Sequence, residues 1–209
     1  MNYPPTNKNN LHMIGLVFDT SGAYGSVTVI KEKKILCYNV NNSPNEQSET
    51  INLLIEKSLA EVGITYNDID YLAVALGPGK FTSLRIGISV ANAIFFATKK
   101  PLLPISNFEA LAYNIKQTEF GVALKATTGK FYFQSFKNNM QNSEIRVINE
   151  KELLELKKDT HIIGDSDTVD EKFMIDARNI ANCASDKIKN KTKFASNYLQ
   201  PKYIINNYL

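Results

Sequence analysis

Apolar and polar positions in the first half of the chain predict three strands, a helix, a strand, a second helix and a final short strand. The predicted strands are residues 14–19, 24–30, 35–40, 71–76 and 102–105, and the predicted helices are residues 46–62 and 81–97. Residues 71–76 are wholly apolar, as expected for a strand buried on both faces. The first helix carries one apolar face, and Gly63 is placed to end it.

The second predicted helix is apolar on nearly all sides. One stripe consists of Leu84, Ile88, Ala91 and Phe95, and another of Ile86, Val90, Ala93, Ile94 and Ala97. An ordinary surface helix has a single apolar stripe, so this helix requires cover on two sides. Its own sheet can provide one cover. The second is either the neighbouring helix or a partner protein, and small residues such as Ser83 and Gly87 would allow close approach of another helix.

The second half repeats the order of elements found in the first. Strands are predicted over 121–124, 130–136, 145–148 and 160–164, with helices over 149–157 and 176–187. Ser106 with Glu109, and Asn149 with Glu152, form capping boxes at helix starts. We therefore predict an α/β protein with two ribonuclease-H-like units in tandem. This is the architecture of the actin, hexokinase and Hsp70 (ASKHA) class, here with a small and degenerate second unit.

The expected division of the chain follows from this repeat. Residues 1–12 form a polar N-terminal extension, residues 13–105 the first unit, and residues 106–209 the second unit with a basic tail.

Gly77-Pro78-Gly79 separates the apolar strand from the long helix. Proline at the second position and glycine at the third favour a type II turn with Gly79 at positive φ. The turn could be a phosphate cradle at a helix N-terminus or a plain tight connection. A P-loop would require Ser or Thr where Phe81 stands, and the dinucleotide motif would require a third glycine where Thr82 stands. Spacing alone therefore favours the plain turn.

Composition and charge argue against several classes of protein, including membrane and secreted proteins. The chain has 209 residues, 44% of them apolar and 22% charged, with a net charge of +3, which does not demand a nucleic-acid partner. No apolar run indicates a membrane span, and the polar start does not resemble a secretion signal. The isolated Cys37 and Cys183 indicate reduced thiols in the cytoplasm. A lysine-rich tract over 187–202 is interpreted as a solvated tail, with contact to RNA phosphates as the alternative.

The segment from Gly77 to Gly87 resembles a family signature. It reads Gly-Pro-Gly-Lys-Phe-Thr-Ser-Leu-Arg-Ile-Gly, and the bacterial TsaB (YeaZ) family has Gly-Pro-Gly-Ser-Phe-Thr-Gly-Leu-Arg-Ile-Gly. The matched signature residues are Gly77, Pro78, Gly79, Phe81, Thr82 and Arg85. Supporting segments are 14–21, 47–49 and 199–203. The sequence departs from the family at Lys80, Ser83, Gln47 (usually His) and the segment 125–127.

The resemblance implies a function without catalysis by this chain. TsaB proteins are non-catalytic partners of TsaD in making threonylcarbamoyladenosine on tRNA, and their first two helices pack against TsaD. The partner-interface residues we expect to face outward are Gln47, Ile51, Ser83, Gly87, Val90, Ala91 and Ile94. We accordingly expect Ala91→Arg to abolish association while leaving the chain folded. The resemblance further implies TsaE as an additional partner, a homodimer when the chain is alone, possible ATP or ADP at the complex interface, and only indirect or weak contact with tRNA.

Few residues offer chemistry of their own. Asp19, followed by Thr20, ends the first strand, where this fold class can hold a metal–nucleotide complex; the plainer interpretation is that Asp19 caps its own turn. The catalytic relatives bind metal through paired histidines on the first helix, which has none here. His12, His161 and the two cysteines are isolated, so we expect no metal site and no cofactor bound by the chain alone. The alternative function is a small nucleotide-dependent kinase-like enzyme of the same fold.

Overall fold

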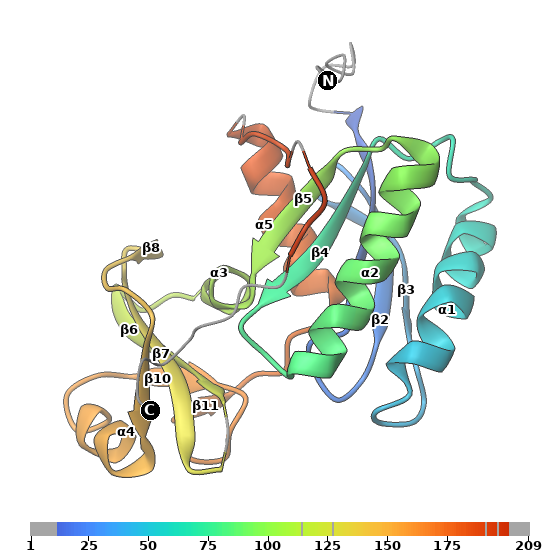
Figure 1. The fold of residues 1–209 in the computed structure, drawn as a ribbon. Helices are drawn as coiled ribbons and strands as arrows, with labels where there is room; N and C mark the ends of the chain where they lie inside the picture. Colours follow the sequence, from blue (N-terminus) through green and yellow to red (C-terminus); the bar gives the residue numbers. More distant parts are fainter. Residues whose placement is uncertain (1–11, 114, 127, 191, 196, 201–209) are drawn as a thin grey trace.

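The computed structural model describes residues 12–113, 115–126, 128–190, 192–195 and 197–200, which form two sheets with helices packed on them. The first sheet has the order β3-β2-β1-β4-β5 (Figure 1). Its strands are β1 (Ile14–Asp19), β2 (Ser26–Lys31), β3 (Lys34–Val40), β4 (Tyr71–Gly77) and β5 (Leu102–Ser106). β1, β2 and β3 are antiparallel neighbours, whereas β4 and β5 continue the sheet in parallel.

Helices cover both faces of this first sheet (Figure 1). α1 (Gln47–Val62) and α2 (Phe81–Thr98) lie side by side on one face, and α5 (Ala177–Lys189) lies on the other. Side chains alternate along β1 accordingly. Leu16 and Phe18 pack under α1 and α2, while Val17 packs under α5. The sheet is thus buried on both faces, which explains the apolar runs in its central strands.

The second sheet has six strands, in the order β11-β10-β6-β7-β8 with β9 also paired to β7. Its strands are β6 (Glu119–Lys125), β7 (Lys130–Lys137), β8 (Met140–Gln141), β9 (Arg146–Asn149), β10 (Ile162–Gly164) and β11 (Glu171–Lys172). α4 (Glu150–Leu156) packs on one side through Leu153. α3 (Asn107–Ala112) packs on the other side through Phe108 and so joins the two sheets.

The elements follow the predicted order, with three differences. β8 and β11 were not predicted, because two-residue strands leave no periodic pattern. α3 ends at Ala112, whereas the sequence predicts that this helix continues to about Ile115. α5 follows the second sheet in sequence but packs on the first, where Ile180 and Ala184 join its core. The position of α5 on the first sheet depends on contacts between residues far apart in sequence, so no local pattern could predict it.

Candidate functional site

The Gly77-Pro78-Gly79 turn connects β4 to α2 and contains a cis peptide bond between Gly77 and Pro78. The predicted type II turn is wrong, because the glycine at positive φ is Gly77 (+99°) rather than Gly79. Gly79 is favoured for another reason. A Cβ there would lie 3.2 Å from the Cβ of Ser21, tighter than an ordinary contact, so a larger residue would require the end of β1 to shift by a few tenths of an ångström. Asn107 Nδ2 also donates to Pro78 O at 2.9 Å and holds the turn to α3.

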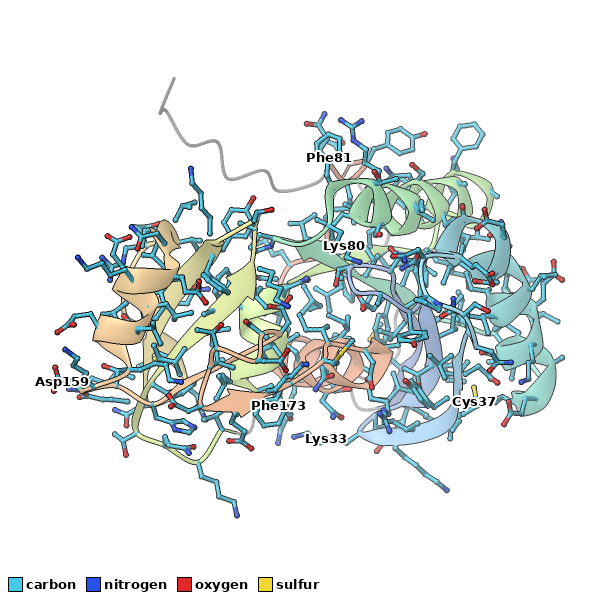
Figure 2. The ribbon with its side chains drawn as sticks, turned by 90° about the horizontal axis from the view of Figure 1, so that it is seen from below. Lys33, Cys37, Lys80, Phe81, Asp159 and Phe173 are labelled. Atoms are coloured by element: carbon cyan, nitrogen blue, oxygen red, sulfur yellow. The ribbon has the colours of Figure 1, made fainter. Side chains whose placement is uncertain are left out.

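The remaining signature residues lie on the first turns of α2. Phe81 and Arg85 form a contact in which the guanidinium carbon lies 3.8 Å from the ring centroid. Both side chains are exposed, as is Thr82. Figure 2 shows Phe81 projecting from the outer side of the helix. The signature therefore has an internal half, the turn, and an external half on the helix surface.

Three of the residues expected to face a partner are buried against the sheet instead. Ser83, Gly87 and Ala91 lie on the inner side of α2, so the expectation that they face outward is wrong. Hydrogen bonds of Thr20, at the end of β1, explain why this side of α2 faces the sheet. The Thr20 hydroxyl donates to Ser83 O at 2.6 Å and accepts from the amide of Gly87 at 3.1 Å. The small residues on α2 thus accommodate the end of β1 and not a second helix.

The two residues expected at the edge of the interface on α1 are also buried, so that expectation is wrong as well. Gln47 Nε2 donates to Gly22 O at 2.8 Å and to Ala23 O at 2.9 Å, which secures the loop between β1 and β2. Ile51 is fully buried in the core beneath α1. Gln47, at the position where the family usually has histidine, therefore has a structural role in this chain.

The outer sides of α1 and α2 carry a different set of apolar side chains. Leu53 and Phe96 are each 63% exposed and Phe81 is 51% exposed. Val90 and Ile94, two of the expected interface residues, are half-buried. We define the outer face as a set of accessible apolar residues on the two helices: Leu53 on α1, and Phe81, Ile86, Val90, Ala93, Ile94, Phe96 and Ala97 on α2.

Sequence reasoning missed Leu53 and Phe96. Leu53 is an apolar residue off the inner stripe of its helix, and Phe96 directly follows the inner residue Phe95. Each is an apolar residue among polar neighbours on its helix face, and this feature could have been noticed in the sequence. The length and composition of α2 would also allow a membrane span, although here the helix packs along the sheet.

Asp19 is completely buried at the end of β1. Its Oδ1 accepts hydrogen bonds from the amide and the hydroxyl of Ser21, at 2.9 and 2.7 Å, so the interpretation that Asp19 caps its own turn is confirmed. Its Oδ2 is buried without a hydrogen-bond partner among the described residues. Burial raises the pKa of Asp19 to about 6; the hydrogen bonds from Ser21 oppose this shift, and the nearby Asp176 carboxylate adds to it.

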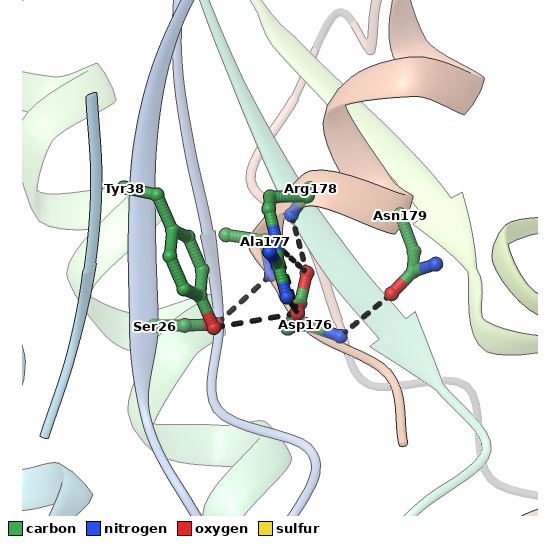
Figure 3. Close-up of polar contacts among 6 residues, drawn as sticks. All are labelled: Ser26, Tyr38, Asp176, Ala177, Arg178 and Asn179. Carbon is green, nitrogen blue, oxygen red and sulfur yellow. Dashed lines mark hydrogen bonds and ion pairs between the residues drawn. The ribbon is translucent and has the colours of Figure 1, made fainter. Parts of the chain in front are cut away.

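Asp176, the residue whose carboxylate adds to the raised pKa of Asp19, caps the N-terminus of α5. Figure 3 shows its contacts. Its Oδ1 accepts from the amide of Arg178 at 2.8 Å, while its Oδ2 lies 2.6 Å from Nη2 of the same arginine. The hydroxyl of Tyr38 on β3 donates to Oδ2 at 3.3 Å, and the amide of Ala177 donates to Ser26 Oγ on β2 at 2.9 Å. These contacts fasten the start of α5 to the edge of the first sheet.

The residues around Asp19 do not fit a metal–nucleotide complex held by this chain alone. Asp19 is fully buried, Thr20 and Ser21 are buried, and both hydroxyls are engaged with protein groups. In the part of the chain that the structure describes, His, Cys, Asp and Glu form no cluster able to hold a metal ion. Cys37 and Cys183 are buried free thiols.

The basic tract is described only in part. Lys187 lies 2.9 Å from Glu109 and so is committed to an ion pair within the chain. Lys189 and Lys193 are exposed. Residues 1–11, Thr127, Lys191 and 201–209, which include Lys202, lie outside the described residues.

Comparison with known proteins relates the chain to one pathway. Residues 41–165 match the family model described as TsaD, tRNA N6-adenosine threonylcarbamoyltransferase. A TsaB protein, named for tRNA threonylcarbamoyladenosine biosynthesis, from Buchnera aphidicola subsp. Schizaphis graminum is 32% identical over 163 residues. That match covers 72% of this chain and 77% of the relative. A Staphylococcus haemolyticus tRNA N6-adenosine threonylcarbamoyltransferase is 33% identical over 120 residues, but the match covers only 35% of that protein.

A solved structure supports the fold. YeaZ from Pseudomonas aeruginosa superposes with a TM-score of 0.73 at 19% identity, covering 92% of this chain and 100% of that chain. The predicted fold class is therefore confirmed, since a chain of nearly the same extent has the same arrangement of elements.

Proposed function

Because this chain belongs to the TsaB (YeaZ) family, we propose that it is the subunit that binds and activates TsaD in tRNA threonylcarbamoyladenosine biosynthesis. In this proposal TsaD transfers the threonylcarbamoyl group to the adenosine next to the anticodon, in the cytoplasm. The present chain contributes no catalytic residue and acts by holding TsaD in its working conformation.

The observation that carries the proposal is the outer face of α1 and α2. Three of its side chains, Leu53, Phe81 and Phe96, are each more than half exposed, although the same helices bury a complete stripe on the sheet. Accessible apolar residues gathered on one side of a protein are typical of a partner-binding surface. The half-buried Val90 and Ile94 would lose their remaining contact with water when such a partner is bound.

The absence of a catalytic role is supported by the chemistry of α1. The position that the family usually fills with histidine is Gln47, and its amide is used to hold Gly22 and Ala23. Asp19 is enclosed and its neighbouring hydroxyls are engaged. A metal-assisted reaction in this chain would need ligands that these residues do not supply.

Further partners belong to the same proposal. An uncovered apolar face can pair with its own copy, so we propose a homodimer when TsaD is absent. TsaE would join the complex, ATP or ADP would bind at the interface between subunits, and contact with tRNA would be indirect or weak. Because Lys187 forms an ion pair with Glu109, fewer lysines of the basic tract are available to contact RNA phosphates than the sequence suggested.

The direct test is binding of the full chain to TsaD of the same organism, measured by calorimetry. Leu53→Arg places a charge on the outer face and is expected to weaken binding at least about tenfold, because a desolvated unpaired charge is costly at an interface. The matched control is Leu154→Arg on α4, since Leu154 is 51% exposed but lies on the second sheet. The control is expected to bind normally.

Two outcomes would overturn the proposal. Equal binding by wild type and Leu53→Arg would remove the outer face as the docking site. Binding of ATP by the isolated chain, lost in Asp19→Asn, would favour the kinase-like alternative, because it would require the enclosed carboxylate to reach a ligand.

A further inference from the structure

The C-terminal strap, defined as residues 192–195 and 197–200, wraps around the edge of the first sheet. Phe194 packs on the α5 side, with its ring centroid 6.2 Å from that of Tyr71. The amide of Ala195 then donates to Leu102 O on the edge strand β5 at 2.8 Å. Leu199 is buried on the opposite side, in the core beneath α1 and α2. Figure 1 shows the strap in red beside α2.

Asn92 fixes the strap to α2. Its Nδ2 donates to Leu199 O at 3.0 Å, and its Oδ1 accepts from the amide of Leu199 at 2.8 Å. One side chain therefore satisfies both backbone groups of a residue 107 positions away in sequence. A shift of the strap by one residue would break both bonds and withdraw Leu199 from the core.

This register determines where Tyr198 lies. Leu199 is buried, whereas the residue before it, Tyr198, is exposed, so the bonds that hold Leu199 inward also fix the backbone from which the Tyr198 side chain projects. Tyr198 is 54% exposed, and its ring meets the ring of Phe95 edge-on, with centroids 5.6 Å apart. Phe96, the next residue on α2, belongs to the outer face and is 63% exposed.

We infer that the strap is the third element of the TsaD-docking surface. In this inference Tyr198 is a contact residue and Asn92 is the positioning residue that presents it. The inference rests on the proposed function. Tyr198 packs on Phe95, and Phe95 directly precedes the outer-face residue Phe96 on α2, so the tyrosine lies beside the outer face. A tyrosine held on one side and accessible on the other is a typical interface anchor, since little rotamer entropy is lost on binding.

The experiment titrates the full chain into TsaD of the same organism by calorimetry, with gel filtration of each variant alone. Tyr198→Ala is expected to weaken binding about 10- to 100-fold, as for an aromatic anchor. Met140→Ala is the matched control, because Met140 is 69% exposed on β8 of the other sheet, and its binding is expected to be unchanged. Tyr198→Gln, which keeps a polar surface residue, is the second variant should Tyr198→Ala fold poorly.

Asn92→Ala tests the positioning role. It is expected to speed hydrogen exchange at the Leu199 amide, because the acceptor of that amide is removed, and to weaken TsaD binding as Tyr198→Ala does. The double variant is expected to bind no more weakly than Tyr198→Ala, since Asn92 acts through the tyrosine. Additive losses would show that Asn92 has a separate effect and would overturn its assigned role.

The outcomes separate this inference from the proposed function. Normal binding by both Tyr198 variants together with weakened binding by Leu53→Arg would overturn the inference and leave the proposed function standing. Unchanged binding in all of these variants would overturn both. Loss of self-association with normal TsaD binding would assign the strap to a second copy of the chain and would also overturn the inference.

Discussion

α2 and α5 pack on opposite faces of the same sheet, yet their outer sides differ. Each buries one apolar stripe, centred on Ile88 and Ala91 in α2 and on Ile180 and Ala184 in α5. The outer side of α5 is polar, with Arg178, Asn179, Asn182, Asp186, Lys187 and Lys189. The outer side of α2 instead includes Ile86, Val90, Ala93, Phe96 and Ala97.

The difference shows which features the fold requires. Covering this sheet needs only one apolar stripe per helix, as α5 demonstrates. Of the second stripe of α2, Ile86, Val90 and Ile94 are partly buried against the core, whereas Ala93 and Ala97 are exposed, as is Phe96, and the core does not explain these three. The proposed TsaD interface would cover these exposed residues. Three predictions test the contrast between inner and outer positions.

The largest effect is expected from the same substitution made on the two sides of α2. Ala91 is fully buried, so Ala91→Arg would bury an unpaired charge and is expected to cost at least about 4 kcal/mol, enough to prevent folding. Our expectation from sequence that this variant stays folded is thus wrong. Ala93→Arg, on the outer side, is expected to keep the free energy of unfolding within about 0.5 kcal/mol while abolishing association.

Urea denaturation and gel filtration with TsaD measure the two effects. The contrast would fail if Ala93→Arg were as unstable as Ala91→Arg, because the outer side would then also belong to the core.

The second prediction concerns the α5 face, where Asp19 lies near Asp176. The pKa of Asp19 is about 6 in the folded chain, against an ordinary aspartate value of 3.8, so between these values the folded state binds more protons than the unfolded state. The free energy of unfolding is therefore expected to fall by about 3 kcal/mol through this group as the pH rises from about 3 to 7.

Asp19→Asn is expected to remove this contribution, because the amide does not titrate. Urea denaturation of both proteins across this pH range gives the comparison. Identical pH profiles would show that Asp19 is not the group responsible.

The smallest effect is expected at Gly87, where α2 approaches the end of β1. A Cβ at this position would lie 2.5 Å from Thr20 Oγ1. Gly87→Ala is therefore expected to destabilise the chain by about 1 to 2 kcal/mol, even though alanine is the better helix former. Ser89→Ala, on the exposed side of α2, is the control and is expected to change stability by less than about 0.5 kcal/mol. A Gly87→Ala variant as stable as this control would show that Thr20 moves aside freely.

The sequence indicated that α2 carries the candidate site, but it did not show which side chains face outward, and five of the seven residues expected there are buried. The two apolar stripes placed a surface on α2, and the signature from Gly77 to Gly87 marked where the helix begins. Small residues on a helix, however, serve equally to admit a strand end or another helix. In the structure these small residues face the end of β1, because the hydroxyl of Thr20 forms hydrogen bonds with the backbone of Ser83 and Gly87.

By itself, the sequence determined the order of the elements, the class of fold and the surplus of apolar surface on α2, because local periodicity and turn residues specify these directly. The tertiary structure alone decided which stripe faces the sheet, that Asp19 is enclosed, that α5 returns to the first sheet, and that Asn92 holds Leu199. Each of these depends on contacts between residues far apart in the chain, and no local pattern records which distant partner a side chain will meet.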